Sequence, residues 1–170
     1  IVDQEACLKY ASSKKIDGVL TIATDYGVLS TSYIAKHLNL PGLDYETAKI
    51  VKNKFKVRRK FNESKVDDFS QYYEVENADS LEKIKENLKY PLIVKPCDGS
   101  GSKGIKRVNS FKELKSAFLD AKGASLSGKV LIEDFIEGTE YGVEWFVFGG
   151  KGRVLGVMKK HMTSPPVFAE

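Results

Sequence analysis

Tyr90 to Val108 reads YPLIVKPCDGSGSKGIKRV and contains a glycine-rich loop between two short segments that resemble strands. Residues 91–95 and 105–108 each have the composition of a β-strand, and residues 99–104 between them fit the pattern G-x-G-x-x-G. The pattern predicts a hairpin with a flexible tip, because glycines let backbone amides approach an anion closely.

Dinucleotide-binding folds and protein kinases share this glycine pattern, and the P-loop is a third glycine-rich nucleotide-binding loop; the flanking residues disfavour all three. A dinucleotide-binding fold needs its glycines at the start of a helix, but here a strand follows and the next helix signal is Ser110. A P-loop needs a lysine directly after its last glycine, but Ile105 follows Gly104. In protein kinases the lysine follows the glycine hairpin, and this chain has neither an H-R-D nor a D-F-G triplet.

Lys95 stands at the end of the strand that enters the loop. A lysine at the end of an apolar strand loses solvation unless an anion accompanies it, and a phosphate is a suitable partner. The other interpretation of the loop is a mobile glycine turn without a ligand. Lys95 favours the anion-binding interpretation.

A second informative stretch is residues 130–144, VLIEDFIEGTEYGVE, in which an apolar strand leads into acids mixed with apolar residues. Adenine needs an apolar surface with backbone polar groups at its edge, and ribose hydroxyls suit a carboxylate further along. Solvated carboxylates on an edge strand are the alternative, and we expect Glu137 to be one of these.

The hydrophobic pattern predicts alternating short elements after residue 68. Strands are predicted at 72–75, 91–95, 105–108 and 130–134, helices at 81–88 and after Ser110, and a hairpin from strands 142–148 and 153–160. Capping-box patterns start the two helices, at Asp79 with Glu82 and at Ser110 with Glu113. The buried face of the second helix is predicted to hold Leu114, Ala117, Phe118 and Ala121. Residues 1–61 predict helices at 6–13, 33–38 and 45–61 and a strand at 18–23.

Length and composition limit the class of protein. The 170 residues suffice for one domain or two small lobes, and 42% hydrophobic with 29% charged residues predicts a folded core. The net charge of +4 concentrates between Lys49 and Lys65, which we interpret as attraction of anionic ligands rather than a nucleic-acid surface. No apolar stretch approaches the roughly 20 residues that span a bilayer. Two cysteines without metal-ligand spacing predict a reducing cytoplasm.

Taken together, the motifs resemble the ATP-grasp superfamily, especially the branch with biotin carboxylase and the carbamoyl phosphate synthetase large chain. The landmarks NKFKVRR, PLIVKP, DGSGSKGI and EDFIEGTEYGVE occur in the family's order. The resemblance implies an α/β (α+β) ATP-grasp fold. It divides the chain into the end of a Rossmann-like pre-ATP-grasp domain (1–45), a linking helix of the large lobe (46–68), the small lobe with its glycine lid (69–135) and the truncated start of the large lobe (136–170).

The same resemblance implies roles for individual residues. Lys54 and Lys95 would hold phosphate oxygens, and Glu140 would bind the ribose hydroxyls. Glu133 and the backbone of Asp134, Phe135 and Ile136 would meet the adenine. The backbone of the lid, at Ser100, Gly101, Ser102 and Gly104, would cover the triphosphate.

The implied activity is that of an ATP-dependent carboxylate–amine ligase that acts through an acylphosphate. ATP, a small carboxylate and Mg²⁺ would be its ligands, and the family's magnesium carboxylates lie further downstream than residue 170. We therefore expect a fragment or the ordered part of a longer ligase, inactive alone, with no catalytic residue assigned. Related ligases often pair through their outer domains, so a homo-oligomer is compatible, whereas nucleic-acid and membrane partners are not expected. The alternatives are a non-catalytic ATP-binding module and a kinase-like nucleotide-binding protein.

Overall fold

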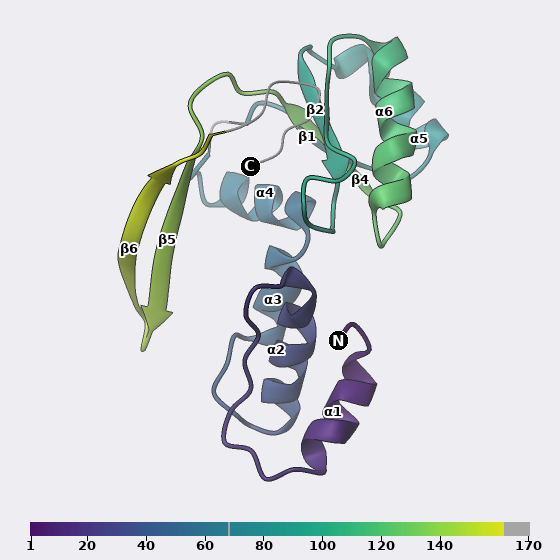
Figure 1. The fold of residues 1–170 in the computed structure, drawn as a ribbon. Coiled ribbons are helices and arrows are strands. Elements are labelled where there is room, and N and C mark those ends of the chain that lie inside the picture. Colours follow the sequence, from purple (N-terminus) through teal and green to yellow (C-terminus); the bar gives the residue numbers. More distant parts are fainter. Residues whose placement is uncertain (68, 162–170) are drawn as a thin grey trace.

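The computed structural model describes residues 1–67 and 69–161. Figure 1 shows three parts: a helical unit at the N-terminal end, a sheet covered by helices, and a hairpin that stands apart from the sheet. The helical unit consists of α1 (Gln4–Ser12), η1 (Asp25–Gly27), α2 (Val28–His37) and α3 (Tyr45–Val51). Helix α4 (Lys54–Glu63) lies between this unit and the sheet.

The central sheet is antiparallel throughout, with strand order β1–β4–β2–β3. Its strands are β1 (Tyr72–Val75), β2 (Leu92–Pro96), β3 (Lys106–Val108) and β4 (Val130–Asp134). In the register, Val94 lies opposite Ile132, and Leu92 lies opposite Val108. Helices α5 (Ala78–Ile84) and α6 (Phe111–Ala124) cover one face, and η2 (Lys85–Asn87) follows α5.

Strand alternation decides which side chains face the site. Leu92 and Val94 are fully buried in the core with the four predicted residues of α6, Leu114, Ala117, Phe118 and Ala121. Successive strand residues point to opposite faces, so Ile93 and Lys95 lie on the other face of the sheet, toward α4. There Phe55 of α4 packs against Tyr72 of β1, with ring centroids 5.8 Å apart. The face opposite the core is therefore the face on which polar groups gather.

One of the two predicted helix caps is confirmed and the other is wrong. Ser110 caps α6 by accepting a hydrogen bond from the Glu113 amide. Helix α5 is capped by Asn77, which forms a reciprocal capping box with Ser80, and not by Asp79. Asn77 accepts from the first-turn amide as well as an aspartate would, so Asp79 becomes a first-turn acid in a favourable position at the helix N-terminus.

Three further predictions for residues 1–63 need correction. Residues 18–23 form no strand, because no described strand pairs with them, and Leu20 and Ile22 are exposed. The predicted helix at 33–38 begins earlier, at Val28. The predicted single helix at 45–61 is two helices, because Asn53 leaves helical geometry and caps α4 by accepting from the Lys56 amide.

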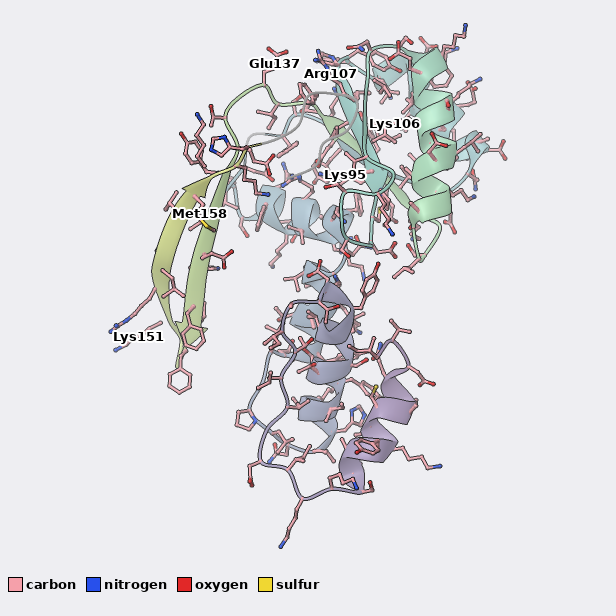
Figure 2. All side chains as sticks on the ribbon, viewed as in Figure 1. Lys95, Lys106, Arg107, Glu137, Lys151 and Met158 are labelled. Carbon is pink, nitrogen blue, oxygen red and sulfur yellow. The ribbon has the colours of Figure 1, made fainter. Side chains whose placement is uncertain are left out.

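The hairpin consists of β5 (Tyr141–Phe148) and β6 (Lys151–Lys159), joined at Gly149 and Gly150, which both have positive φ. Trp145 and Phe148 are 64% and 79% exposed. Lys151 lies at the hairpin's tip and Met158 on β6 (Figure 2). Residues 162–170 of the predicted segment 136–170 lie outside the described residues. None of the described helices is long and apolar enough to cross a membrane.

Candidate functional site

Two adjoining cavities lie on the α4 side of the sheet. The larger has a volume of about 600 Å³ and the smaller about 340 Å³. Ser102, Ile105 and Lys160 line both, so the cavities meet beneath the glycine loop. Their combined walls come from strand β2, the glycine loop, the start of α4, the segment after β4 and the residue after β6. In the larger cavity, η1, the start of α2, the end of α3 and the end of α6 also contribute.

The base of the glycine loop is fixed by backbone and carboxylate hydrogen bonds. The Lys54 amide, the first of α4, donates to the Cys97 carbonyl at 2.7 Å and thereby ties the helix to the end of β2. The Asp98 carboxylate accepts from the amides of Leu126 and Ser127 at 2.8 and 3.0 Å. Burial acts to raise the pKa of Asp98, but these bonds and those from the Ser125 and Ser127 side chains outweigh it and lower the pKa. Asp98 is therefore a charged anchor of the loop.

Left-handed backbone lets the loop turn over the larger cavity. Gly99, Gly101, Ser102 and Gly104 all have positive φ. A Cβ on Gly104 would lie 2.9 Å from the Ala124 Cβ, whereas a Cβ on Gly101 would meet no atom within 4 Å. The loop is thus packed closely on α6 at its end and open at its tip.

Lysines give the larger cavity a positive charge. Lys54 lines it, and its Nζ donates to the Gly99 carbonyl at 3.1 Å. Burial lowers the pKa of Lys54, and the charges of Lys95 and Lys52 lower it further. Because burial and like charge both disfavour its charged form, an anion in this cavity would relieve both.

The smaller cavity has apolar walls and a buried carboxylate. Its apolar lining comes from Phe69, Ile93, Ile105, Phe135 and Ile136. The Glu133 side chain, only 2% exposed, bonds to Arg58 through Oε2···Nε at 2.6 Å and forms an ion pair with Lys95. Figure 2 shows Lys95 on β2, between α4 and the glycine loop. The smaller cavity therefore has one buried anion that is paired with two cations.

Residues 133–137 form a braced segment along this cavity. The Asp134 carboxylate accepts from the amides of Ser70 and Gln71 at 2.7 and 3.0 Å. Burial acts to raise the pKa of Asp134, and hydrogen bonds from Gln71 and Ser70 outweigh it and lower the pKa. The Phe135 amide donates a hydrogen bond to the Pro91 carbonyl at 3.3 Å, which holds this segment against the start of β2. Phe135 and Ile136 both line the cavity.

Charged residues brace the outer side of this segment. The Arg107 guanidinium lies over the Phe135 ring, 4.5 Å from its centroid, and within 3.8 Å of Glu137 (Figure 2). Glu137 is highly exposed, as its predicted solvated role requires. At the other end of the cavity, the Lys160 Nζ lies 2.9 Å from a carboxylate oxygen of Glu140.

The structure brings together all but one of the predicted site residues. The larger cavity is lined by Lys54, Ser100, Gly101 and Ser102, and the smaller by Lys95, Ser102, Glu133, Asp134, Phe135, Ile136 and Glu140. Gly104 lines neither, because it packs against α6.

Several residues of the site were not assigned from the sequence, among them Asp25, Lys52 and Asp98 in the wall of the larger cavity. Five more bear on the chemistry described below: Arg58, Phe69, Ile93, Ile105 and Lys160. Two had a usable signal. Arg58 stands four positions after Lys54 and therefore on the same helix face, and Ile93 stands two before Lys95 and on the same strand face. Ile105 directly follows the glycine loop and Lys160 ends the last predicted strand, whereas nothing in the local sequence pattern marked Phe69.

The antiparallel sheet with its glycine lid, facing a basic helix start and an acidic segment, defines the ATP-grasp fold, as the motifs indicated. The solved structure of an L-amino acid ligase from Bacillus licheniformis superposes with a TM-score of 0.79 at 29% identity, over 98% of this chain and 38% of that one. A biotin carboxylase domain from Hydrogenobacter thermophilus shares the fold, with a TM-score of 0.74 at 17% identity over 98% of this chain and 39% of that one.

The sequence itself places the chain more narrowly. Residues 62–164 match the family described as D-ala D-ala ligase C-terminus, and the chain belongs to this family. It is 41% identical over 78 residues to a D-alanine–D-alanine ligase of Acetivibrio thermocellus, a match that covers 46% of this chain. The match covers 19% of that relative's length, so the chain corresponds to part of the relatives it resembles.

Proposed function

We propose that this chain binds ATP and supplies the nucleotide-binding part of an ATP-dependent carboxylate–amine ligase. One observation carries the proposal: an apolar cavity with a buried carboxylate opens into a larger cavity where lysines gather beneath a glycine loop. A purine nucleoside and a polyphosphate need these two environments, side by side and in this order along the ligand.

The smaller cavity suits the adenosine part of ATP. Adenine would lie against Ile93 and Ile105, with its polar edge toward the backbone at residues 134–136. The Glu140 carboxylate at the rim would accept hydrogen bonds from the ribose hydroxyls. Because Lys160 pairs with Glu140, it would fix the orientation of that carboxylate.

The larger cavity suits the triphosphate. Lys54 lines it from α4, and Lys95, whose charge acts on Lys54, lines the adjoining smaller cavity from β2. The backbone at Ser100 and Gly101 would cover the phosphates. In the unliganded site the charges of Lys54 and Lys95 repel each other, and negatively charged phosphate oxygens would offset this repulsion. The lysines therefore bind and orient the polyphosphate.

Ligases of the resembling family transfer the terminal phosphoryl group to a carboxylate, and an amine attacks the acylphosphate that results. Catalysis of this kind depends on positioning and charge stabilisation. Mg²⁺ would supply part of that stabilisation, but no three His, Cys, Asp or Glu side chains within residues 1–67 and 69–161 are grouped to hold a metal ion. We therefore assign to these residues the binding and orientation of the nucleotide alone. The location we propose for the enzyme is the cytoplasm.

Titration calorimetry with ATP tests the proposal, and Lys95→Ala is the decisive variant. Loss of a charged hydrogen bond to phosphate is expected to weaken ATP binding roughly 10- to 100-fold. Arg58 still pairs with Glu133 in this variant, so the carboxylate keeps a partner. Lys112→Ala, an exposed change on α6, is the matched control and should bind ATP as the unsubstituted protein does.

Equal ATP affinities in the two variants would contradict the assignment of Lys95. Preference for NAD over ATP would favour a dinucleotide-binding protein. In the full-length protein, release of ADP only when a carboxylate and an amine are both present would identify a ligase, whereas ATP binding without such turnover would identify a binding module.

A further inference from the structure

We propose that Arg58 is a positioning residue, which holds Glu133 so that Lys95 stays available to the polyphosphate. The inference rests on the proposed function, because it concerns how the nucleotide site is prepared for its anionic ligand. The observation behind it is a buried group of charges in which one carboxylate, Glu133, is shared by two cations from different elements.

The contact between Arg58 and Glu133 is closely fitted. The guanidinium Nε lies 2.6 Å from Oε2, and Nη2 lies 3.4 Å from Oε1. Arg58 comes from α4 and Glu133 from β4, 75 positions later in the chain. Because the planar guanidinium meets both carboxylate oxygens, this contact fixes the orientation of the carboxylate as well as its charge.

Arg58 is itself held from two further sides. The Phe69 ring lies beneath the guanidinium, with its centroid 3.9 Å from Cζ. The Asp67 carboxylate lies 4.0 Å from Nη1, and its two buried oxygens accept no hydrogen bond from the described residues. Arg58 is thus a fixed cation between two acids.

The charges in this group balance, and Lys95 is the member that can move toward the ligand. Two acids, Asp67 and Glu133, are matched by two cations, Arg58 and Lys95. A polyphosphate and Glu133 compete for the ammonium group of Lys95. If Lys95 were the sole partner of Glu133, its move to phosphate would leave a buried carboxylate unpaired, which is strongly unfavourable.

Arg58 removes this conflict. With Arg58 in place, Glu133 keeps a two-point partner when Lys95 turns to the phosphate. Without it, Glu133 depends on Lys95 alone, and the lysine is withheld from the ligand. The effect is therefore specific to the phosphate end of the nucleotide and requires the negative charge of Glu133.

Arg58→Met tests the proposal, with calorimetric titrations of ATP, adenosine and tripolyphosphate. We expect about tenfold weaker binding of ATP and tripolyphosphate, as for a lost charged partner, and less than about twofold change for adenosine. Arg58→Lys keeps the charge without the fork and should recover part of the loss. The matched control is Arg59→Met on the same helix, whose side chain is 58% exposed and which should bind all three ligands unchanged.

A double-substitution cycle identifies Glu133 as the route. In a Glu133→Gln protein the neutral amide no longer competes for Lys95, so adding Arg58→Met should change tripolyphosphate affinity less than about twofold. Urea unfolding of each variant shows that it is folded before titration. Should Arg58→Met not fold, Arg58→Lys carries the test, with weaker tripolyphosphate binding and unchanged adenosine binding expected.

Three results would overturn the inference while leaving ATP binding intact. These are unchanged tripolyphosphate affinity in the folded Arg58 variants, an equal loss for adenosine and tripolyphosphate, and the same loss with or without Glu133→Gln. If the unsubstituted protein binds neither ATP nor tripolyphosphate, the proposed function fails and this inference fails with it.

Discussion

The two adjoining cavities differ in how their charge is balanced. In the smaller, the buried Glu133 carboxylate is already paired with Arg58 and Lys95, and apolar side chains make up much of the remaining wall. In the larger, Lys54 lies close enough to other lysines for their charge to lower its pKa. One cavity has balanced its charge within the protein, whereas the other has an excess of positive charge.

The walls of the two cavities differ in the same way. Strands β2 and β4 and the segment braced by Asp134 form much of the smaller cavity, so its shape is set largely by the hydrogen-bonded sheet. A glycine loop with positive φ at Gly99 and Gly101 covers the larger one. The difference indicates that the proposed nucleoside site is shaped in advance, whereas the proposed phosphate site depends on its ligand for balance of charge.

The largest effect is expected from a substitution at Gly104, where the glycine loop that covers the larger cavity packs against α6. Gly104→Ala places a Cβ 2.9 Å from the Ala124 Cβ and 3.1 Å from the Ala121 Cα, at a φ of +71°. Strain and overpacking together are expected to lower the free energy of unfolding by about 2–4 kcal/mol. Urea unfolding followed by circular dichroism measures the loss.

The tip of the same loop supplies the control for that prediction. Gly101→Ala has the same left-handed strain, at a φ of +73°, but its Cβ meets no atom within 4 Å. It should lower the unfolding free energy by only about 1 kcal/mol. If the two variants lose equal stability, the packing of Gly104 on α6 does not anchor the loop.

A smaller effect is expected from the wall of the nucleoside cavity. Ile93→Ala removes a half-buried apolar side chain that lines it, so adenosine and ATP should both bind about 1–2 kcal/mol more weakly. Tripolyphosphate binding, measured by the same calorimetric titration, should not change. A loss for tripolyphosphate as large as that for adenosine would show that the two cavities are not independent.

Salt should have the opposite selectivity: it should weaken the binding of tripolyphosphate and leave the binding of adenosine unchanged. Raising the ionic strength from about 0.05 M to 0.5 M screens the attraction between lysines and phosphates, so tripolyphosphate affinity should fall about tenfold, or about 1.4 kcal/mol. Adenosine carries no charge and should bind equally at both concentrations. Equal salt dependence for the two ligands would contradict the assignment of phosphate to the lysine-rich cavity.

The sheet and its helix α6 could be predicted from the sequence because local pattern determines them. Residues 72–75 and 130–134 form strands with the predicted bounds, and Leu114 and Phe118 face the core. The segment 18–23 has an equally apolar composition but is no strand. Composition gives a residue's preference for a strand, but a strand also needs a partner with which to form hydrogen bonds.

The residues of the site could be predicted where they belong to a local sequence motif. They could not be predicted where folding brings together residues that are far apart in the chain. Lys95 and Glu133 stand within recognisable motifs. The contact of Arg58 with Glu133 joins α4 to β4 across 75 positions, and it depends on the break at Asn53 that separates α4 from α3. The sequence predicts a continuous helix at this point, because an asparagine within a helical pattern does not reveal whether its side chain will cap the next helix.

The smallest predicted effect concerns Lys54, and it follows from the unbalanced charge of the larger cavity. Its pKa in the folded protein lies below the usual 10.5, first because of burial and then because of Lys95 and Lys52. Between the folded pKa and 10.5, the unfolded chain holds a proton that the folded protein has released. The free energy of unfolding contributed by Lys54 therefore rises with pH across this interval, and at neutral pH the charged lysine destabilises the folded state.

Lys54→Met removes both the charge and this dependence on pH. The unfolding free energy of the variant minus that of the unsubstituted protein should be most favourable near neutral pH. It should decline toward pH 10.5, by less than about 1 kcal/mol because the group is only partly buried. Urea unfolding at several pH values measures the difference, with the exposed Lys112→Met as control. A difference that grows as the pH rises would mean that the charged Lys54 stabilises the unliganded protein. The positive charge of the larger cavity would then not lower the stability of the folded state.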